Sequence, residues 1–125
     1  MYATVNPTAA SLDIRPLSQV YRALGDETRL RIVALLVHGE LCVCHIEKGL
    51  GISQPNASRQ LGILRAAGVV DYRREGTWVH YFISPSSHAL IEKQLEFLTK
   101  EFGAERTLRT DHARVRKSCG PDACK

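Results

Sequence analysis

The chain has 125 residues, 44% of them apolar, and a formal net charge of +4. This length fits one domain with a compact core, and the modest positive charge permits a polyanionic partner without identifying one. No apolar run is long enough to cross a membrane, and residues 1–10 lack the charged and apolar segments of a secretory signal. We therefore expect a cytoplasmic protein without a membrane partner.

The N-terminal part of the chain predicts an arm and two helices. Residues 1–14 hold small polar side chains and are predicted to form a flexible arm. A helical spacing of apolar residues begins at Leu17 and is interrupted at Gly25. Asp26 is a good N-cap for a second helix, which Gly39 ends.

A helix-turn-helix is predicted next. A short helix near residues 42–48 is followed by a glycine-containing turn at 49–52, and Ser53 then caps another helix. Pro55 lies in the first turn of that helix, where its missing N–H costs little, and Gly68 ends it. A short helix, a tight turn and a capped second helix are the order of elements in a helix-turn-helix.

A β-hairpin follows the helix-turn-helix. Residues 69–74 and 77–83 are rich in aromatic and β-branched side chains, and the dipeptide at 75–76 supplies a glycine for the turn. A hairpin of this size, directly after such a helix pair, predicts the wing of a winged helix-turn-helix.

The chain is expected to end in a helix and a tail. Residues 86–102 carry apolar side chains at helical spacing, whereas residues 105–125 hold six Lys or Arg against three Asp or Glu and few large apolar groups. The predicted organisation is a mainly α domain with a β-hairpin wing at 15–104, followed by a flexible cysteine-containing tail at 105–125.

The predicted DNA-binding face lies on the second helix of the helix-turn-helix and on the wing. Polar and basic side chains off the apolar stripe of this helix face outward, where Gln and Asn can pair with adenine and Arg with guanine or phosphate. Backbone N–H groups at the helix start favour a phosphate, and the wing arginines suit phosphates or the minor groove. The predicted contacts are Ser53, Gln54, Asn56, Ser58, Arg59, Arg73, Arg74 and Gly76.

The apolar stripes of the first and last helices predict a homodimer. One helix-turn-helix contacts only a few base pairs, and two copies spaced by one turn of DNA read a palindrome. The alternative is that both stripes are buried within one chain. The predicted interface residues are Leu17, Val20, Tyr21, Ile91, Leu95 and Leu98.

The four cysteines form two close pairs, Cys42/Cys44 and Cys119/Cys124. In a reducing compartment such pairs indicate a soft metal, a metalloid or redox sensing. Residues two apart in a regular helix lie about 200° apart, so one ion gathers Cys42 and Cys44 only where the helix is deformed. Trivalent arsenic or antimony prefers three thiolates, and Cys119 and Cys124 are the candidates for the third sulfur or for a separate two-thiol site. His45 is a candidate ligand for zinc or cadmium.

Four segments together resemble the ArsR/SmtB family of metalloregulatory repressors. They are GDETRLRI at 25–32, ELCVC at 40–44, SQPNASRQL at 53–61 and RREGTWVHY at 73–81. The resemblance implies a homodimer that binds an inverted-repeat operator on double-stranded DNA and leaves it when an ion binds.

The ELCVC segment is similar to that of the arsenite- and antimonite-responsive members of the family. In those members the segment usually runs on to a third cysteine, as ELCVCDLC. Here His45 and Glu47 stand where the aspartate and that cysteine would be. The similarity of the ELCVC segment implies As(III) or Sb(III) as the inducer, with Cys42 and Cys44 as two of its ligands. The departure at Glu47 leaves the source of a third thiolate open.

Together these features predict a transcriptional repressor released by As(III) or Sb(III), and not an enzyme. One alternative keeps the DNA binding but changes the signal to thiol oxidation, a sulfur species, or a soft divalent metal such as Cd, Pb or Zn. Another is a small thiol enzyme with Cys42 as a nucleophile at a helix N-terminus. An enzyme, however, has no use for the polar helix face and the basic wing.

Overall fold

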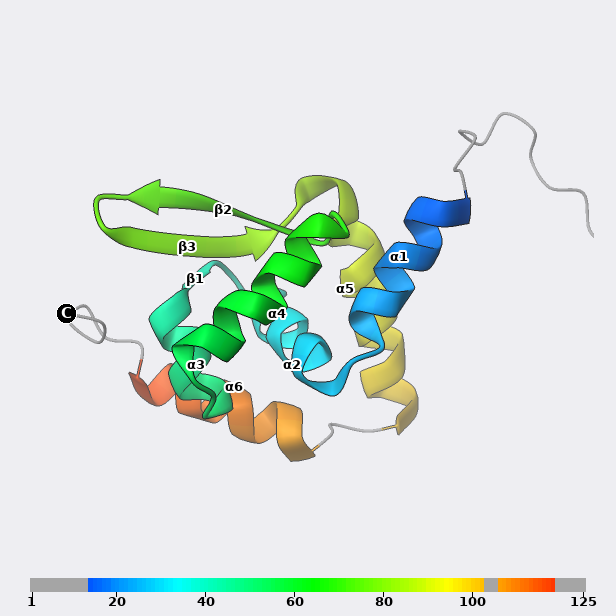
Figure 1. The fold of residues 1–125 in the computed structure, drawn as a ribbon. Helices are drawn as coiled ribbons and strands as arrows, with labels where there is room; N and C mark the ends of the chain where they lie inside the picture. Colours follow the sequence, from blue (N-terminus) through cyan, green and yellow to red (C-terminus); the bar gives the residue numbers. More distant parts are fainter. Residues whose placement is uncertain (1–13, 103–105, 119–125) are drawn as a thin grey trace, which may run out of the picture.

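The computed structural model describes residues 14–102 and 106–118, except for the side chains of residues 98, 99, 101 and 102. Helices form most of the protein, and one hairpin projects from the helical body (Figure 1). The elements are α1 (Ile14–Leu24), α2 (Glu27–Leu36), β1 (Leu41–Cys42), α3 (Val43–Leu50), α4 (Gln54–Ala66), β2 (Val70–Glu75), β3 (Trp78–Ile83), α5 (Pro85–Phe102) and α6 (Arg106–Ser118).

Local capping signals set the helix boundaries. The Asp26 carboxylate accepts a hydrogen bond of 3.1 Å from the backbone N–H of Arg29 at the start of α2. The Ser53 hydroxyl accepts one of 3.3 Å from the backbone N–H of Asn56 at the start of α4. Both predicted N-caps are therefore confirmed, and α3 and α4 form the helix-turn-helix.

The sheet has three antiparallel strands in the order β1-β3-β2. Strands β2 and β3 form the predicted wing, and Gly76 takes a positive φ of 62° in its turn. The sequence did not predict β1, which pairs Leu41 with Tyr81 and Cys42 with His80. This short strand joins the segment before α3 to the wing.

The core lies between the helix-turn-helix, α2 and the base of the wing. Its members are apolar side chains with almost no solvent exposure, contributed by all six described helices and the hairpin. The largest of these residues are Ile32, Leu36, Ile46, Leu61, Leu64 and Ile91. Within the described residues, no helix is both long and apolar enough to cross a membrane.

Helix α6 corrects one expectation. The sequence predicts a flexible tail from residue 105 onward, and this is wrong for residues 106–118, which form a helix packed on α3 and α2 (Figure 1). Two contacts explain the packing. Gly49 of α3 leaves room for Val115, and the buried Asp111 carboxylate receives two hydrogen bonds from Arg31 of α2.

Replacing Gly49 by alanine is expected to loosen α6. A Cβ at this position would overlap Val115 Cγ2, so either the Val115 side chain or the two helices must shift. Overpacking costs about 1–3 kcal/mol and helix propensity returns up to about 1 kcal/mol, so we expect a net loss of about 1–2 kcal/mol in urea unfolding. Gly49→Ala with Val115→Ala should recover most of the loss.

Gly62→Ala in α4 is the matched control for that experiment, because a Cβ there meets no atom within 4 Å. This variant should be as stable as the wild type or more stable by up to about 1 kcal/mol. Equal behaviour of the two alanine variants would contradict the close approach of α3 and α6.

Candidate DNA-binding and thiol sites

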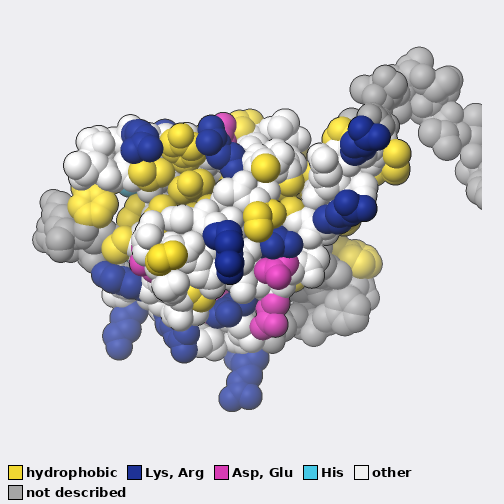
Figure 2. Space-filling model, viewed as in Figure 1, with side chains coloured by type: hydrophobic (Ala, Val, Ile, Leu, Met, Phe, Trp, Pro, Cys, Tyr) yellow, Lys and Arg dark blue, Asp and Glu magenta, His cyan; other side chains and the backbone are white. Residues whose placement is uncertain are grey.

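Most of the predicted DNA-binding residues are exposed to solvent. Ala57, Leu61 and Leu64 of α4 are buried, and the opposite side of the helix faces solvent. On the face that carries α4 and the hairpin, Lys and Arg side chains outnumber those of Asp and Glu (Figure 2). Such a face suits a polyanion. The exposed predicted residues are Ser53, Gln54, Ser58, Arg59, Arg73, Arg74 and Gly76, whereas Asn56 is half-buried.

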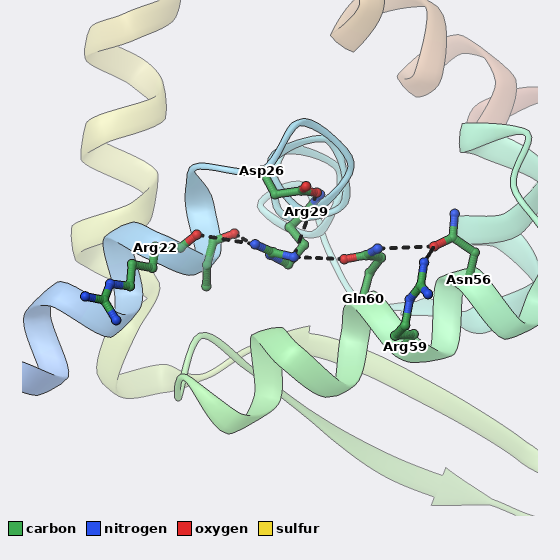
Figure 3. A network of polar contacts seen from close by, with 7 residues as sticks. Arg22, Asp26, Arg29, Asn56, Arg59 and Gln60 are labelled. Carbon is green, nitrogen blue, oxygen red and sulfur yellow. Dashed lines mark hydrogen bonds and ion pairs between the residues drawn. The ribbon is translucent and has the colours of Figure 1, made fainter.

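A chain of hydrogen bonds that the sequence analysis missed runs beneath this face (Figure 3). Arg29 Nη1 donates to Gln60 Oε1 at 3.0 Å, and Gln60 Nε2 donates to Asn56 Oδ1 at 3.1 Å. Arg59 Nη2 donates to the same Asn56 oxygen at 3.2 Å. Gln60 is only 9% exposed, and both the oxygen and the nitrogen of its buried amide have a hydrogen-bond partner within the protein. These hydrogen bonds link Arg29 of α2 to Asn56 and Arg59, two of the predicted DNA-binding residues.

The arginines of the wing differ in their surroundings. Arg73 forms ion pairs with Glu40 at 2.5 Å and with Glu75 at 3.1 Å. Its hydrogen bonds to these two carboxylates raise the pKa of Arg73. The Arg74 guanidinium lies 5.8 Å from the centre of the Tyr72 ring, within the range of a cation–π contact. Arg73 thus connects the wing to Glu40, which lies two positions before Cys42 in the sequence.

Cys42 and Cys44 do not lie in one regular helix. Cys42 has extended backbone angles (φ −78°, ψ 158°) as the N-cap of α3, and Cys44 belongs to the first turn. Cys42 therefore lies outside the regular helical geometry that would hold the two side chains about 200° apart. Cys42 is 4% exposed and carries a reduced thiol, whereas Cys44 is half-buried and disulfide-bonded. The predicted tail ligands Cys119 and Cys124 lie outside the described residues.

His45 lies beside the first thiol. Its Nδ1 is 3.5 Å from Cys42 Sγ, and its buried Nε2 has no hydrogen-bond partner among the described residues. Burial, then the charge of Lys48 and the nearby His80, lower the pKa of His45. The ring is therefore neutral at pH 7, the form in which imidazole binds a metal. Residues 14–102 and 106–118 hold no group of three His, Cys, Asp or Glu side chains arranged for a metal ion.

A surface groove joins the thiols to the predicted DNA-binding face. Cys42 lines it from β1 and Cys44 from α3. Gln54 and Ser58 line it from α4, and Arg74 lines it from the wing. The sequence predicted the two sets of residues separately, and the fold places both thiols and three of the predicted DNA-binding residues on the walls of one groove.

The predicted dimer stripe is only partly available. Tyr21 is 48% exposed, and Leu17 and Val20 are half-buried. The prediction is wrong for Ile91, which is 1% exposed within a single chain and belongs to the core. Leu95 packs partly against the core, and the side chain of Leu98 lies outside the described residues. Among the described side chains of α1 and α5, the exposed large apolar residues are Ile14, Tyr21, Leu90 and Phe97.

Two histidine rings connect α6 to the end of α2. The rings of His38 and His112 lie 4.5 Å apart between their centroids, tilted by 43°. Burial, then His38 and Arg116, lower the pKa of His112 below 6.5. These rings line a cavity between α2, α5 and α6. Its other charged residues are Arg31, Glu92, Glu96, Lys100 and Arg109.

We expect the packing of α6 to weaken in mild acid. The folded state favours the neutral His112 ring, so near pH 6 it binds fewer protons than the unfolded chain does. The stabilisation is present above about pH 6.5 and is lost as the pH falls through the lowered pKa. Urea unfolding at pH 7.5 and 5.5 should show a smaller pH dependence for His112→Gln than for wild type. Identical pH dependence would exclude this role of His112.

Bacterial transcriptional regulators are similar to this chain in sequence and in fold. The Escherichia coli (strain K12) arsenical resistance operon repressor is 47% identical over 79 residues, which are 62% of this chain and 68% of the relative. This chain belongs to the ArsR family of bacterial regulatory proteins. The model of that family, described as "Bacterial regulatory protein, arsR family", matches residues 26–72. The predicted family is therefore confirmed.

Two further relatives bear on function and assembly. The cadmium resistance regulatory protein CadC of Listeria innocua is 43% identical over 75 residues, which are 59% of this chain and 63% of the relative. The homodimeric winged helix-turn-helix domain of Mb0332 from Mycobacterium bovis is similar in structure, with a TM-score of 0.65 and 30% identity. The similarity covers 75% of this chain and 92% of that one. These relatives are transcriptional regulators and not enzymes, and the predicted winged helix-turn-helix fold is confirmed.

Proposed function

We propose that this protein is a dimeric repressor that binds an inverted-repeat operator and leaves it when As(III) or Sb(III) binds Cys42, Cys44 and a third thiol. The observation that carries the proposal is the groove lined by both thiols, by α4 and by the wing. An ion that draws the two sulfurs together acts on the same walls that would face DNA.

The surroundings of Cys42 support a coupling between ion binding and DNA binding. Cys42 caps the first helix of the helix-turn-helix and also pairs with His80 of the wing strand β3. Drawing its sulfur toward Cys44 therefore displaces the start of α3, the pairing of β1 with β3, or both. An ion that binds this displaced state more tightly lowers the DNA affinity by linkage.

Trivalent arsenic takes a third thiolate, and α6 supports Cys119 or Cys124 as its source. Helix α6 ends at Ser118, and its last turns line a cavity with Glu40 and Leu41, directly before Cys42. The C-terminal end of α6 therefore lies on the side of the molecule that carries the segment leading to Cys42.

A soft divalent ion such as cadmium is the second candidate inducer. His45 favours it, because a neutral imidazole beside a thiol, with a buried unpartnered nitrogen, suits a Cys and His ligand set. CadC of Listeria innocua is named for cadmium resistance. This candidate uses the same Cys42 and Cys44 and differs in its remaining ligand.

The deciding experiment is a titration of the protein–DNA complex. The protein is reduced first, because Cys44 is disulfide-bonded in the structure. Fluorescence anisotropy then follows its binding to DNA from upstream of its own gene during addition of arsenite, antimonite, cadmium or zinc. Release by micromolar arsenite or antimonite but not by zinc is expected. Release by cadmium alone would favour the second candidate, and the absence of any DNA binding would overturn the proposal.

A further inference from the structure

The hydrogen bonds beneath α4 determine which groups Asn56 offers to DNA. An arginine side chain only donates hydrogen bonds, whereas an amide group both donates and accepts. Arg29 therefore fixes the oxygen of Gln60 toward itself at 3.0 Å. The nitrogen of Gln60 must then face Asn56, 3.1 Å away, and donate to its oxygen.

The same oxygen is fixed from its other side. Arg59 Nη2 donates to Asn56 Oδ1 at 3.2 Å, so both acceptor positions of this oxygen are taken. The amide nitrogen of Asn56 points away from Gln60 and Arg59 (Figure 3). Since arginines occupy both ends of the chain of bonds, neither amide can rotate by half a turn without placing donor against donor. Asn56 is left with N–H donors alone.

Arg29 is itself held in place by α1. Its Nε donates to the carbonyl oxygen of Ala23 at 2.8 Å, and Nη2 donates to that of Arg22 at 3.4 Å. These carbonyls belong to the last turn of α1, where a cation is favourable. The guanidinium thus joins the end of α1 to Gln60 of α4.

We propose that Arg29 is a positioning residue that acts through Gln60 to make Asn56 a donor-only group, so that Asn56 recognises guanine in the operator. The proposal rests on the proposed DNA-binding function of α4. Guanine offers two neighbouring acceptors, N7 and O6, in the major groove, whereas adenine offers an acceptor beside an N6 donor. The paired contact of Asn56 with adenine, expected from residue type alone, needs the oxygen that Arg59 and Gln60 occupy.

The test begins with the operator that the reduced wild-type protein selects from a random DNA pool. Each guanine is then replaced in turn by 7-deazaguanine, which lacks the N7 acceptor, and each adenine by purine, which lacks the N6 amino group. At one position per half-site, 7-deazaguanine should weaken binding by wild type about 10-fold and binding by Asn56→Ala hardly at all. Coupling of Asn56 to an adenine N6 group, to another base or to no base would overturn the proposal.

The role of Arg29 is tested by the base preference and not by affinity alone. Arg29→Met should reduce the preference for guanine over adenine at that position about 10-fold while binding to unrelated DNA stays unchanged. Arg22→Met is the matched control, because it removes one positive charge from α1 while the Arg22 carbonyl that Arg29 uses remains. A uniform loss across all sequences in Arg29→Met would show a merely structural role.

Failure of this inference differs from failure of the proposed function. Protein that selects no sequence from the pool contradicts DNA recognition by α4 and the inference with it. Protein that selects an operator without any guanine coupled to Asn56 retains the proposed function and contradicts only the inference.

Discussion

Protein carrying both Cys42→Ser and Cys44→Ser is expected to bind its operator as tightly as wild type and to remain bound when arsenite is added. Hydroxyl oxygens are hard ligands, and trivalent arsenic requires soft thiolates. An effector of this kind typically weakens binding about 5- to 150-fold, and that change should disappear. The fold should tolerate Cys42→Ser, because His45 Nδ1, 3.5 Å from the Cys42 sulfur, can accept a hydrogen bond from the new hydroxyl.

Anisotropy titrations with arsenite measure this effect directly. Cys119→Ser and Cys124→Ser, each made alone, then identify the third ligand, because only the variant that lacks it should lose the response. Unchanged release from the Cys42/Cys44 double variant would remove these thiols as the sensor. Release by an oxidant without any metal, abolished by the same substitutions, would instead favour redox sensing.

Arg31→Met is expected to lower the free energy of unfolding by about 3–5 kcal/mol. The Asp111 carboxylate is 1% exposed and receives 2.8 Å hydrogen bonds from both Nε and Nη2 of Arg31. Removing the guanidinium leaves a buried charge without its partner. Urea unfolding at one fixed protein concentration measures the loss, because the proposed dimerisation would make the apparent stability depend on concentration.

The double variant Arg31→Met with Asp111→Leu separates the ion pair from the packing. Replacing both charges by apolar groups of similar size should restore most of the lost stability. Asp71→Asn is the control at an exposed pair, since Arg65 and Asp71 are about half exposed and 3.4 Å apart, and we expect a change below about 1 kcal/mol. Equal effects of Arg31→Met and Asp71→Asn would contradict the burial of the Asp111 carboxylate.

The position of α6 gives the Arg31–Asp111 pair a functional consequence. Helix α6 packs on α3, whose N-cap is Cys42, and it leads directly into the tail that holds Cys119 and Cys124. If a tail thiol completes the arsenite site, variants that detach α6 should need more arsenite for release. The double variant Arg31→Met with Asp111→Leu should need the same arsenite concentration for release as the wild type.

The sequence by itself determined the helix-turn-helix and the wing. Asp26 and Ser53 cap helices through hydrogen bonds to residues three positions further on, and Gly76 closes a tight turn. Such signals act over a few neighbouring residues, so they are legible without the fold. The outward side of α4 followed from the spacing of Ala57, Leu61 and Leu64, and the family followed from four short segments.

Only the tertiary structure decided the features that join distant parts of the chain. Strand β1 has two residues and exists because β3 pairs with it. Helix α6 has few large apolar side chains, and its burial depends on Gly49 and on Arg31, which is 80 residues from Asp111. Helical spacing placed Ile91 on the apolar stripe of α5. It did not distinguish the side of α5 that packs in the core from the side that is exposed.

The hydrogen-bonding role of the Asn56 amide was likewise decided by the tertiary structure. Residue type allows this amide to donate or to accept. Its orientation is fixed by the hydrogen bonds from Arg59 and Gln60, and Gln60 is itself oriented by Arg29, 31 residues earlier in the chain. Local propensity and periodicity thus determined which elements form. Long-range packing and donor–acceptor matching determined which side-chain groups those elements present at their surface.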